Sequence, residues 1–289
     1  MKPLIISHAD CTDGLTAAWV ALRSLGDAEV HFAHHGTDPP DVKGREVHML
    51  DFSYKRRVME RLIFALDSGS LTLLDHHKTA EADLADLPHV ERVSMTFDMK
   101  HCGARLAFDH FGGRDSGSPV HHAERFVDYV QDRDLWKWQL PDSRLVSTAI
   151  DAYPRTFEAW DHLVLRPPEQ LADEGRIIEP YRQRCIESAC ALARLGKIGG
   201  HVVPVANTSE MRVASDTAHT LAAGYPFAAT YWVRADGIIK FSLRSREEGI
   251  DVSEIAVAYG GGGHPHAAGF EMQPEQFADW VLGLTRYAP

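Results

Sequence analysis

PLIISHADCTDG at residues 3–14 decides the fold, together with VHMLDFS at residues 47–53 and LTLLDHH at residues 71–77. Each stretch is a short apolar run that ends in acidic or imidazole side chains. Helical periodicity follows the first run over residues 15–25 and the second over residues 54–66, and EVHFAH from residue 29 predicts a further strand. Short strands that alternate with helices are typical of a doubly wound parallel sheet, so the sequence predicts an α/β fold.

The rest of the sequence predicts two further parts. Helical periodicity over residues 102–111 and 121–131 completes a first domain at 1–145. A charged stretch with a long amphipathic helix at 169–195 makes residues 146–197 a helical connector. From 198 to 289 the runs VVPVAN, FAATYWV and GIIKFSL alternate with helical segments and a glycine run, which predicts a smaller α/β domain.

Composition excludes several classes of protein. Thirty Lys and Arg residues against 41 Asp and Glu give a formal net charge of −11, which opposes binding to long nucleic acids. No apolar run approaches the roughly 18 to 20 residues that a membrane span needs, so we expect no membrane partner and a cytoplasmic location. The 4 cysteines form no CxxC pair, which favours reduced, structural thiols over a thiolate zinc site.

The ends of the predicted strands carry the functional residues. In an open parallel sheet the functional crevice lies beyond the carboxyl ends of the strands. A lone Asp there is commonly a helix N-cap and a lone His is commonly structural, but three successive strands that all end this way are poorly explained by coincidence. The side chains concerned are His8, Asp10, Asp13, Asp51, Asp75, His76 and His77.

So many carboxylates at one rim would repel one another unless divalent cations neutralise them. Oxygen and imidazole ligands without thiolate suit Mn²⁺, with Mg²⁺, Co²⁺ or Fe²⁺ as alternatives. The number of ligands exceeds the needs of one ion. Two ions that share a carboxylate can activate water and stabilise the leaving oxygen of a phosphoryl group, and Asp51 is the natural bridge.

HADCTDG, LDFS, LDHHKT and QDRDLW resemble the motifs of the DHH phosphoesterase family, and the triplet that names the family stands at residues 75–77. Near the C-terminus, SLRS and GGGGHPHAAGF resemble the substrate-binding domain that accompanies one branch of this family. These motifs span residues 5–270 in the order of the family. The resemblance implies a catalytic cleft between the two domains.

The resemblance also implies roles for individual residues. It places His8, Asp10 and Asp51 on the first metal ion, and it leaves His77 facing the substrate phosphate, with Asp75 orienting its neighbours. The second ion would take Asp13, Asp51, His76 and an acid of the fourth motif. We prefer Asp132 for that acid, because in the family an aromatic residue often follows the ligand by four positions, as Trp136 does, with Asp134 as the alternative.

One departure from the family concerns the first motif. The family places its two acids one residue apart, whereas Cys11 and Thr12 separate Asp10 from Asp13. The longer loop either still presents both carboxylates or leaves Asp10 off the metal, with a water in its place. We therefore rank Asp13 above Asp10 as a ligand.

The smaller domain carries the residues expected to bind substrate. Four consecutive glycines let backbone N–H groups approach an anion closely, although a flexible turn is the alternative. The resemblance adds a histidine that would contact the substrate phosphate or ribose and an arginine that would contact a terminal phosphate. The full set is Arg244, Gly261, Gly262, Gly263 and His264.

The predicted function is Mn²⁺-dependent hydrolysis of short oligoribonucleotides or linear dinucleotides. Alternatives within the enzyme class are a phosphatase acting on 3′-phosphoadenosine 5′-phosphate and a phosphodiesterase acting on cyclic nucleotides or cyclic dinucleotides. A catalytically silent nucleotide sensor and a polyphosphatase rank lower. The long helix at 169–195 would offer a surface for a homodimer.

Overall fold

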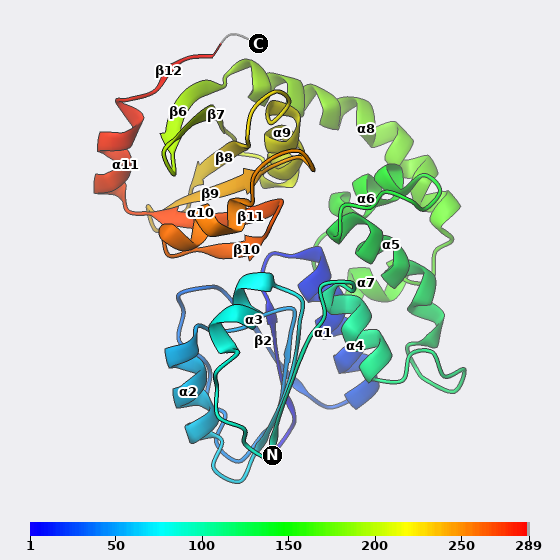
Figure 1. The fold of residues 1–289 in the computed structure, drawn as a ribbon. Helices are drawn as coiled ribbons and strands as arrows, with labels where there is room; N and C mark the ends of the chain where they lie inside the picture. The colour runs from blue at the N-terminus through cyan, green and yellow to red at the C-terminus, as the bar shows by residue number, and fades with distance from the viewer. Residues whose placement is uncertain (288–289) are drawn as a thin grey trace. The chain divides into compact units, whose positions relative to one another are not determined.

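The computed structural model describes residues 1–287, and the chain divides into two compact units, Met1–Ile178 and a second that begins at Glu179 (Figure 1). The division falls inside α8 (Pro168–Ala191), next to the proline that this helix contains at position 180. Helices α6 (Ser143–Ala152) and α7 (Phe157–Leu163), which the sequence assigns to a connector, pack into the core of the first unit. The finer division at residues 145 and 197 stays a prediction.

The first unit contains a five-stranded sheet in the order β2-β1-β3-β4-β5, with every neighbouring pair parallel. The predicted doubly wound α/β fold is confirmed. The sequence did not reveal β5, because its residues are only half-buried or exposed and so lack an apolar run. The strands are β1 (Leu4–His8), β2 (Glu29–Ala33), β3 (Glu46–Leu50), β4 (Ser70–Asp75) and β5 (Val93–Phe97).

Alternate strand residues face opposite sides of this sheet. Leu4 and Ile6 join a core cluster with α2 (Arg56–Ala65) and α3 (Lys78–Leu84). Ile5 instead packs with α1 (Thr12–Leu25) and α4 (Gly103–His110). Figure 1 shows α2 on one side of the strands and α1 and α4 on the other. The helices that follow β1 and β3 therefore cover opposite faces.

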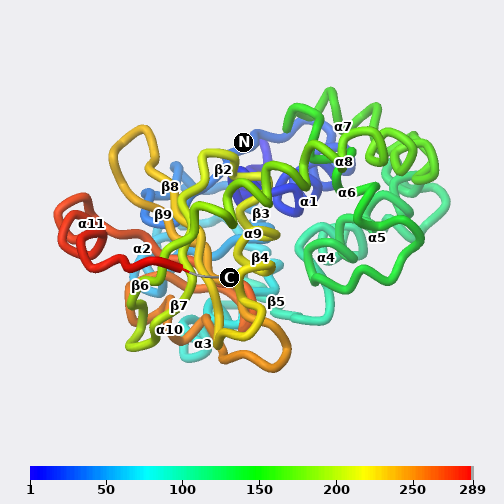
Figure 2. Tube along the Cα trace, turned by 90° about the horizontal axis from the view of Figure 1, so that it is seen from above, coloured from blue at the N-terminus to red at the C-terminus, as the bar shows by residue number. Residues whose placement is uncertain are grey.

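A further layer of helices extends the second of these clusters. The short η1 (His121–Ala123) leads into α5 (Glu124–Asp134), and both pack with α6 and α7 against α1 and α4. Figure 2 shows α4, α5 and α6 grouped together within the first unit. Because Trp160 is completely buried here, α7 is an integral part of this unit's core.

The second unit is built on a seven-stranded sheet in the order β10-β11-β9-β8-β7-β6-β12. Its β7 and β8 are parallel, and the other neighbouring pairs within the described chain are antiparallel. The strands are β6 (Arg194–Ile198), β7 (His201–Asn207), β8 (Ala228–Val233), β9 (Ile239–Arg244), β10 (Gly262–His264), β11 (Ala267–Met272) and β12 (Thr285–Arg286).

Helices cover both faces of this second sheet. One core cluster includes α10 (Val252–Ala258) with α11 (Pro274–Val281) packed against it, and a smaller cluster lies under α9 (Ala214–Leu221), which η2 (Met211–Val213) precedes. The predicted helix at 169–195 ends earlier, since β6 already begins at Arg194. Within residues 1–287, no helix combines the length and the apolar character that crossing a membrane requires.

Candidate metal centre

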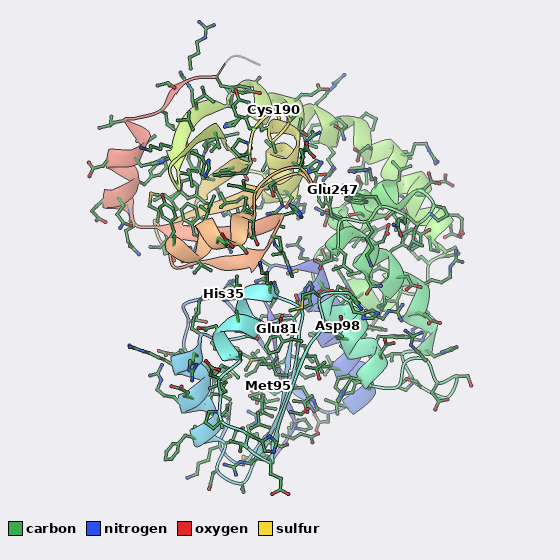
Figure 3. The ribbon with its side chains drawn as sticks, viewed as in Figure 1. His35, Glu81, Met95, Asp98, Cys190 and Glu247 are labelled. Atoms are coloured by element: carbon green, nitrogen blue, oxygen red, sulfur yellow. The ribbon has the colours of Figure 1, made fainter. Side chains whose placement is uncertain are left out.

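The side chains predicted to bind metal gather where β1, β3 and β4 end. Strands β1 and β3 are neighbours in the sheet, and the helices that follow them lie on opposite faces. This is the point in a doubly wound sheet where the connections diverge and leave room for a ligand. Asp98, which follows β5, lies at the same end of the sheet (Figure 3).

Asp51 lies at the centre of the cluster. Its Oδ1 is 3.1 Å from His76 Nε2 and its Oδ2 is 3.7 Å from His8 Nδ1. The side chain is only 1% exposed, and Oδ2 has no hydrogen-bond partner in the described chain. Asp51 also has φ of 54°, in the left-handed region that non-glycine residues seldom occupy and that is often found at functional sites. Asp51 is therefore placed between two imidazoles, as a bridging ligand would be.

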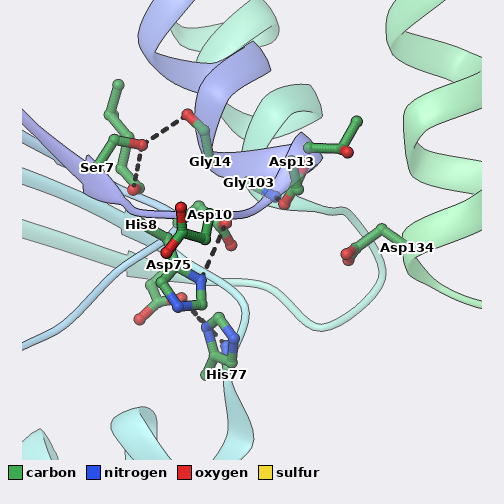
Figure 4. Close-up of polar contacts among 12 residues, drawn as sticks. Ser7, His8, Asp10, Asp13, Gly14, Asp75, His77, Gly103 and Asp134 are labelled. Atoms are coloured by element: carbon green, nitrogen blue, oxygen red, sulfur yellow. Dashed lines mark hydrogen bonds and ion pairs between the residues drawn. The ribbon is translucent and has the colours of Figure 1, made fainter. Parts of the chain in front are cut away.

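Asp13 connects the first motif to α4. Its two carboxylate oxygens accept hydrogen bonds from the backbone N–H groups of Gly103 and Ala104, at 2.7 and 2.8 Å (Figure 4). Asp13 thus caps α4 rather than its own helix α1. Its Oδ2 also lies 3.6 Å from His76 Nε2, so the carboxylate faces the cluster while it is fixed by the helix end.

The structure corrects the choice between the two acids of the fourth motif. Asp132 accepts hydrogen bonds from the backbone N–H groups of Gln139 and Leu140, at 2.9 and 3.3 Å, and holds the loop after α5. Asp134 instead reaches toward Asp13, with its Oδ2 3.6 Å from His76 Nε2 (Figure 4). The preference for Asp132 is wrong in this geometry, because residues two apart on a helix point about 200° apart.

Asp75 organises the DHH triplet. Its Oδ1 accepts hydrogen bonds from the backbone N–H of His76 at 2.7 Å and of His77 at 3.3 Å, and it lies 2.6 Å from His77 Nδ1. Ser53 Oγ donates to its other oxygen at 2.5 Å. Although burial opposes the charged form, the Asp75 carboxylate raises the pKa of His77 to about 9. Asp75 therefore orients the His77 ring and favours its protonated form.

The carboxylates of the cluster have opposed pKa shifts. Burial and the neighbouring charges of Asp51 and Asp134 raise the pKa of Asp13 well above its usual range. Burial also raises the pKa of Asp134. Burial acts in the same direction on Asp51, but the hydrogen bond with His76 and the nearby imidazole of His8 outweigh it and hold the pKa of Asp51 well below its usual range. Asp13 and Asp51 are buried and Asp134 is partly buried, so the three carboxylates cannot all carry charge at low cost, and a divalent cation would remove that conflict.

Asp10 and Cys11 are placed differently from the expectation. The side chain of Asp10 is 74% exposed, and its closest imidazole contact is 4.0 Å, to His34. Among the described residues, Asp10 joins none of the groups with metal-binding geometry, whereas Cys11 lies with His8 and Asp51. The sequence reasoning missed Cys11. The signal was available, because Cys11 lies two positions before Asp13 with only Thr12 between them. This is the spacing at which the family places the other acid of the first motif.

The second unit brings two of its predicted phosphate contacts into one row. Arg244 on β9 and His264 on β10 both pair with Ala267 of β11, from opposite sides. Directly paired residues point to the same face, so the two side chains lie two strands, or about 10 Å, apart on that face. Arg244 Nη2 also donates to Ser215 Oγ at 2.7 Å, which orients the guanidinium.

The glycine run has a structural explanation in this unit. A Cβ on Gly261 would lie 2.0 Å from the carbonyl oxygen of Gly269, and a Cβ on Gly263 would lie 2.6 Å from that of Ala267. Gly262 and Gly263 belong to β10, so the run is not only a loop. Close packing against β11 is therefore one reason for glycine here, and phosphate binding by Gly261, Gly262 and Gly263 stays a prediction.

Comparison with known proteins agrees with these observations. The family model of the DHHA1 domain matches residues 202–281. An uncharacterised protein of Acanthamoeba polyphaga mimivirus is 24% identical over 295 residues, which cover 92% of this chain and 66% of that protein. The oligoribonuclease NrnB of Bacillus subtilis (strain 168) is 25% identical over 235 residues, covering 76% of this chain and 57% of that protein. The chain thus spans under two thirds of the length of these curated relatives.

A solved structure shares the fold. The DHH domain of a member of the s1p family of ribosomal proteins aligns over 99% of this chain and 88% of its own, with a TM-score of 0.53 and 11% identity. The doubly wound sheet, the cluster of acids and imidazoles at its rim and the C-terminal match all agree with the resemblance to DHH phosphoesterases. The second unit carries a match to the DHHA1 domain, and these relatives support the resemblance to DHH phosphoesterases.

Proposed function

We propose that this protein is a divalent-cation-dependent phosphodiesterase that hydrolyses short oligoribonucleotides or linear dinucleotides. The observation that carries the proposal is the group of buried and partly buried carboxylates that converge on His76. Asp51 Oδ2 and Asp134 Oδ2 are both buried without a hydrogen-bond partner in the described chain. Such atoms are costly to leave unpaired, so they fit a site that binds cations.

Two sets of residues fit two cations. His8 and Asp51 would hold one, and the other would contact Asp51 together with the side chains on the far side of the cluster, which are Asp13, His76 and Asp134. The donors are oxygen and imidazole, which suit Mn²⁺, with Mg²⁺, Co²⁺ and Fe²⁺ as alternatives. When bound, such a pair supplies an activated water and neutralises charge on the phosphoryl group.

The DHH triplet would bind the substrate phosphate. Asp75 holds His77 Nδ1, so the ring can present only Nε2 to the substrate. As an imidazolium, this group donates a charge-assisted hydrogen bond to a phosphate oxygen, and the bond strengthens as negative charge develops during the reaction. Asp75 therefore acts by orienting His77 and by keeping its proton.

The second unit would bind the end of the substrate. Arg244 offers a planar fork of N–H donors that suits a terminal phosphate, and His264 lies in the same row of the sheet. A substrate recognised through its terminal phosphate is short or is attacked from an end. The net charge of −11 supports this choice, because it disfavours long polyanions but not a dinucleotide.

The curated relative from Bacillus subtilis favours oligoribonucleotides over the alternatives, since it is named as an oligoribonuclease. A phosphatase acting on 3′-phosphoadenosine 5′-phosphate and a cyclic dinucleotide phosphodiesterase remain the competing activities. All three would use the same acids and imidazoles. Direct comparison of substrates is therefore the test.

The test is hydrolysis of pApA, 3′-phosphoadenosine 5′-phosphate and a cyclic dinucleotide, each with Mn²⁺ and with EDTA. We expect Mn²⁺-dependent release of AMP from pApA, faster than either other reaction, because only pApA offers both an internal diester and a terminal phosphate. Asp51→Asn should abolish this release. The matched control is Asp67→Asn, since Asp67 has the same left-handed backbone, with φ of 55°, but is exposed and outside the cluster. Failure of the folded, metal-loaded protein on pApA would contradict the proposal.

A further inference from the structure

Three potential ligand atoms lie together on one side of Asp51. His8, Cys11 and Asp51 each offer one ligand atom, and these atoms lie within 4.8 Å of one another. They come from the last residue of β1, the residue before α1, and the residue after β3. The group therefore combines an imidazole nitrogen, a thiol sulfur and a carboxylate oxygen from three separate points of the chain.

Helix capping does not explain a cysteine at position 11. Cys11 has the extended backbone of an N-cap residue, with φ of −119° and ψ of 136°, but its side chain makes no capping hydrogen bond. Ser, Thr, Asp and Asn are the residues that stabilise this position, and cysteine is not among them.

Core packing does not explain it either. Cys102 is completely buried within a core cluster, whereas Cys11 is half-buried and belongs to none of the clusters in the described chain. The thiol instead lies with the imidazole of His8 and the carboxylate of Asp51. Its position is therefore that of a functional side chain rather than of a small apolar one.

The carboxylate beside Cys11 gives independent evidence for a cation. Asp51 Oδ2 is buried and lacks a hydrogen-bond partner in the part of the chain that the structure describes. The His8 Nδ1 atom, at 3.7 Å, is too distant for a hydrogen bond, yet the separation suits two ligands of one ion. An unpaired carboxylate oxygen at this depth indicates a positively charged partner.

Asp10 cannot supply the missing ligand from its observed position. Its carboxylate is largely exposed and its contact is with His34, itself 44% exposed. Asp10 also has φ of 55°, so the chain turns sharply between β1 and Cys11. The sulfur of Cys11, and not the carboxylate of Asp10, occupies the inner position of this loop.

We propose that Cys11 Sγ is a ligand of the cation held by His8 and Asp51. The inference deepens the proposed function by naming a ligand and a metal preference for the same site. As the sulfur–metal bond forms, the thiol proton leaves to solvent. At this one position, a set of nitrogen, sulfur and oxygen donors favours Zn²⁺, Co²⁺ or Fe²⁺, since thiolate is a soft ligand, whereas the oxygen and imidazole donors around Asp13, His76 and Asp134 still suit Mn²⁺.

The first experiment is titration of the full-length protein with Co²⁺, followed by absorption spectroscopy. A thiolate bound to Co²⁺ gives an intense charge-transfer band in the near ultraviolet, which oxygen and nitrogen ligands do not give. We expect the band in wild-type protein and in Cys185→Ser, and its loss in Cys11→Ser. Cys185 is a suitable control because it is also a half-buried free cysteine, located in α8.

Metal affinity gives a second measure. Equilibrium dialysis should show that Cys11→Ser weakens Co²⁺ binding by about 10-fold or more. Loss of a group that only supports a metal ligand already costs about 10-fold to 100-fold in metal affinity. Asp10→Asn should change the affinity by less than Cys11→Ser. A larger loss of Co²⁺ affinity in Asp10→Asn than in Cys11→Ser overturns the proposal. So does a charge-transfer band that survives in Cys11→Ser, or wild-type protein that binds Co²⁺ without the band.

A third measurement needs no substitution, so it is unaffected if Cys11→Ser folds poorly. Wild-type protein is alkylated with iodoacetamide with and without Zn²⁺, and the modified cysteines are identified by mass spectrometry. Zn²⁺ should protect Cys11 and leave Cys185 unchanged. Equal alkylation of Cys11 with and without bound Zn²⁺ overturns the proposal.

These readouts do not depend on turnover. If the protein shows the Co²⁺ band but hydrolyses none of the three substrates, the inference about Cys11 stands and the proposed function fails. If it hydrolyses pApA without the band, the proposed function stands and the inference fails.

Discussion

Gly103 is held against Asp51, where a Cβ would lie 2.3 Å from the Cβ of Asp51 and 2.9 Å from its Cα. Gly103→Ala must therefore displace Asp51 or the start of α4, which Asp13 caps. We expect kcat/KM for pApA to fall by about 100-fold, the cost of moving a reacting group by about 1 Å. Steady-state kinetics checks this, with Gly117→Ala as the control because its Cβ would meet only ordinary contact at 3.8 Å. Unchanged kcat/KM in Gly103→Ala would contradict the proposal that the position of Asp51 is critical for hydrolysis.

Asp132 and Asp134 should separate stability from metal binding. Asp132→Asn weakens two hydrogen bonds to a charged acceptor, so we expect about 1.5–3 kcal/mol lower unfolding free energy, with Mn²⁺ affinity retained. Asp134→Asn should lose Mn²⁺ affinity. In EDTA its unfolding free energy should not fall, because burial already raises the pKa of Asp134 and disfavours the charged carboxylate. Urea unfolding and Mn²⁺ binding measure the two effects. Loss of Mn²⁺ affinity in Asp132→Asn alone would reverse the assignment.

At the scale of elements, α7 is fixed to α1 by polar and apolar contacts. Trp160 is completely buried, and its Nε1 donates to Thr16 Oγ1 at 2.9 Å. In the same contact Asp161 accepts hydrogen bonds from Trp19 Nε1 at 2.9 Å and Arg23 Nε at 2.7 Å. This contact makes α7 part of the first unit's fold.

Trp160→Ala should lower the unfolding free energy by about 3–5 kcal/mol, because it leaves a cavity in the core and removes the partner of Thr16. Leu165→Ala, at a side chain that is 66% exposed, should change it by less than about 0.5 kcal/mol. Urea denaturation checks both values. A loss of under about 1 kcal/mol in Trp160→Ala would show that α7 does not contribute to the core in solution.

The elements also show what sequence reasoning can reach. The parallel order follows from apolar runs and helix periods, because burial on both faces leaves a strong pattern in β1, β3 and β4. The half-exposed β5 leaves no such pattern. The choice between Asp132 and Asp134 depends on how far α5 is rotated about its axis, and the position of Cys11 depends on the path of one loop. Residue spacing does not encode the rotation of α5. It places Cys11 two positions before Asp13, but it does not show that the loop brings the thiol to His8 and Asp51.

At the scale of the whole molecule, pH should affect stability through the metal centre. The pKa of His77 is raised to about 9, against an unfolded value of about 6.5. Between pH 6.5 and 9, His77 therefore keeps its proton in the folded protein and loses it in the unfolded chain. The stabilisation that His77 contributes is complete below pH 6.5 and is lost as pH rises toward 9. In EDTA we expect the unfolding free energy to fall across that interval.

His77→Gln should remove most of this pH dependence, while His89→Gln, at an exposed site, should keep it. Urea unfolding at pH 6.5, 7.5 and 9 measures the slope. An identical slope in wild-type protein and His77→Gln would exclude His77 as its source.

The cap that Asp13 places on α4 has a consequence for how the protein is made. Asp13 and its two N–H donors are 90 and 91 positions apart in the chain. During synthesis the first motif leaves the ribosome long before α4 exists, and closing so long a loop is slow compared with forming local structure. The rim of acids is therefore completed late. Until then, the carboxylate of Asp13, the thiol of Cys11 and the imidazole of His8 are exposed to solvent in the newly made chain and are not yet arranged as a metal site.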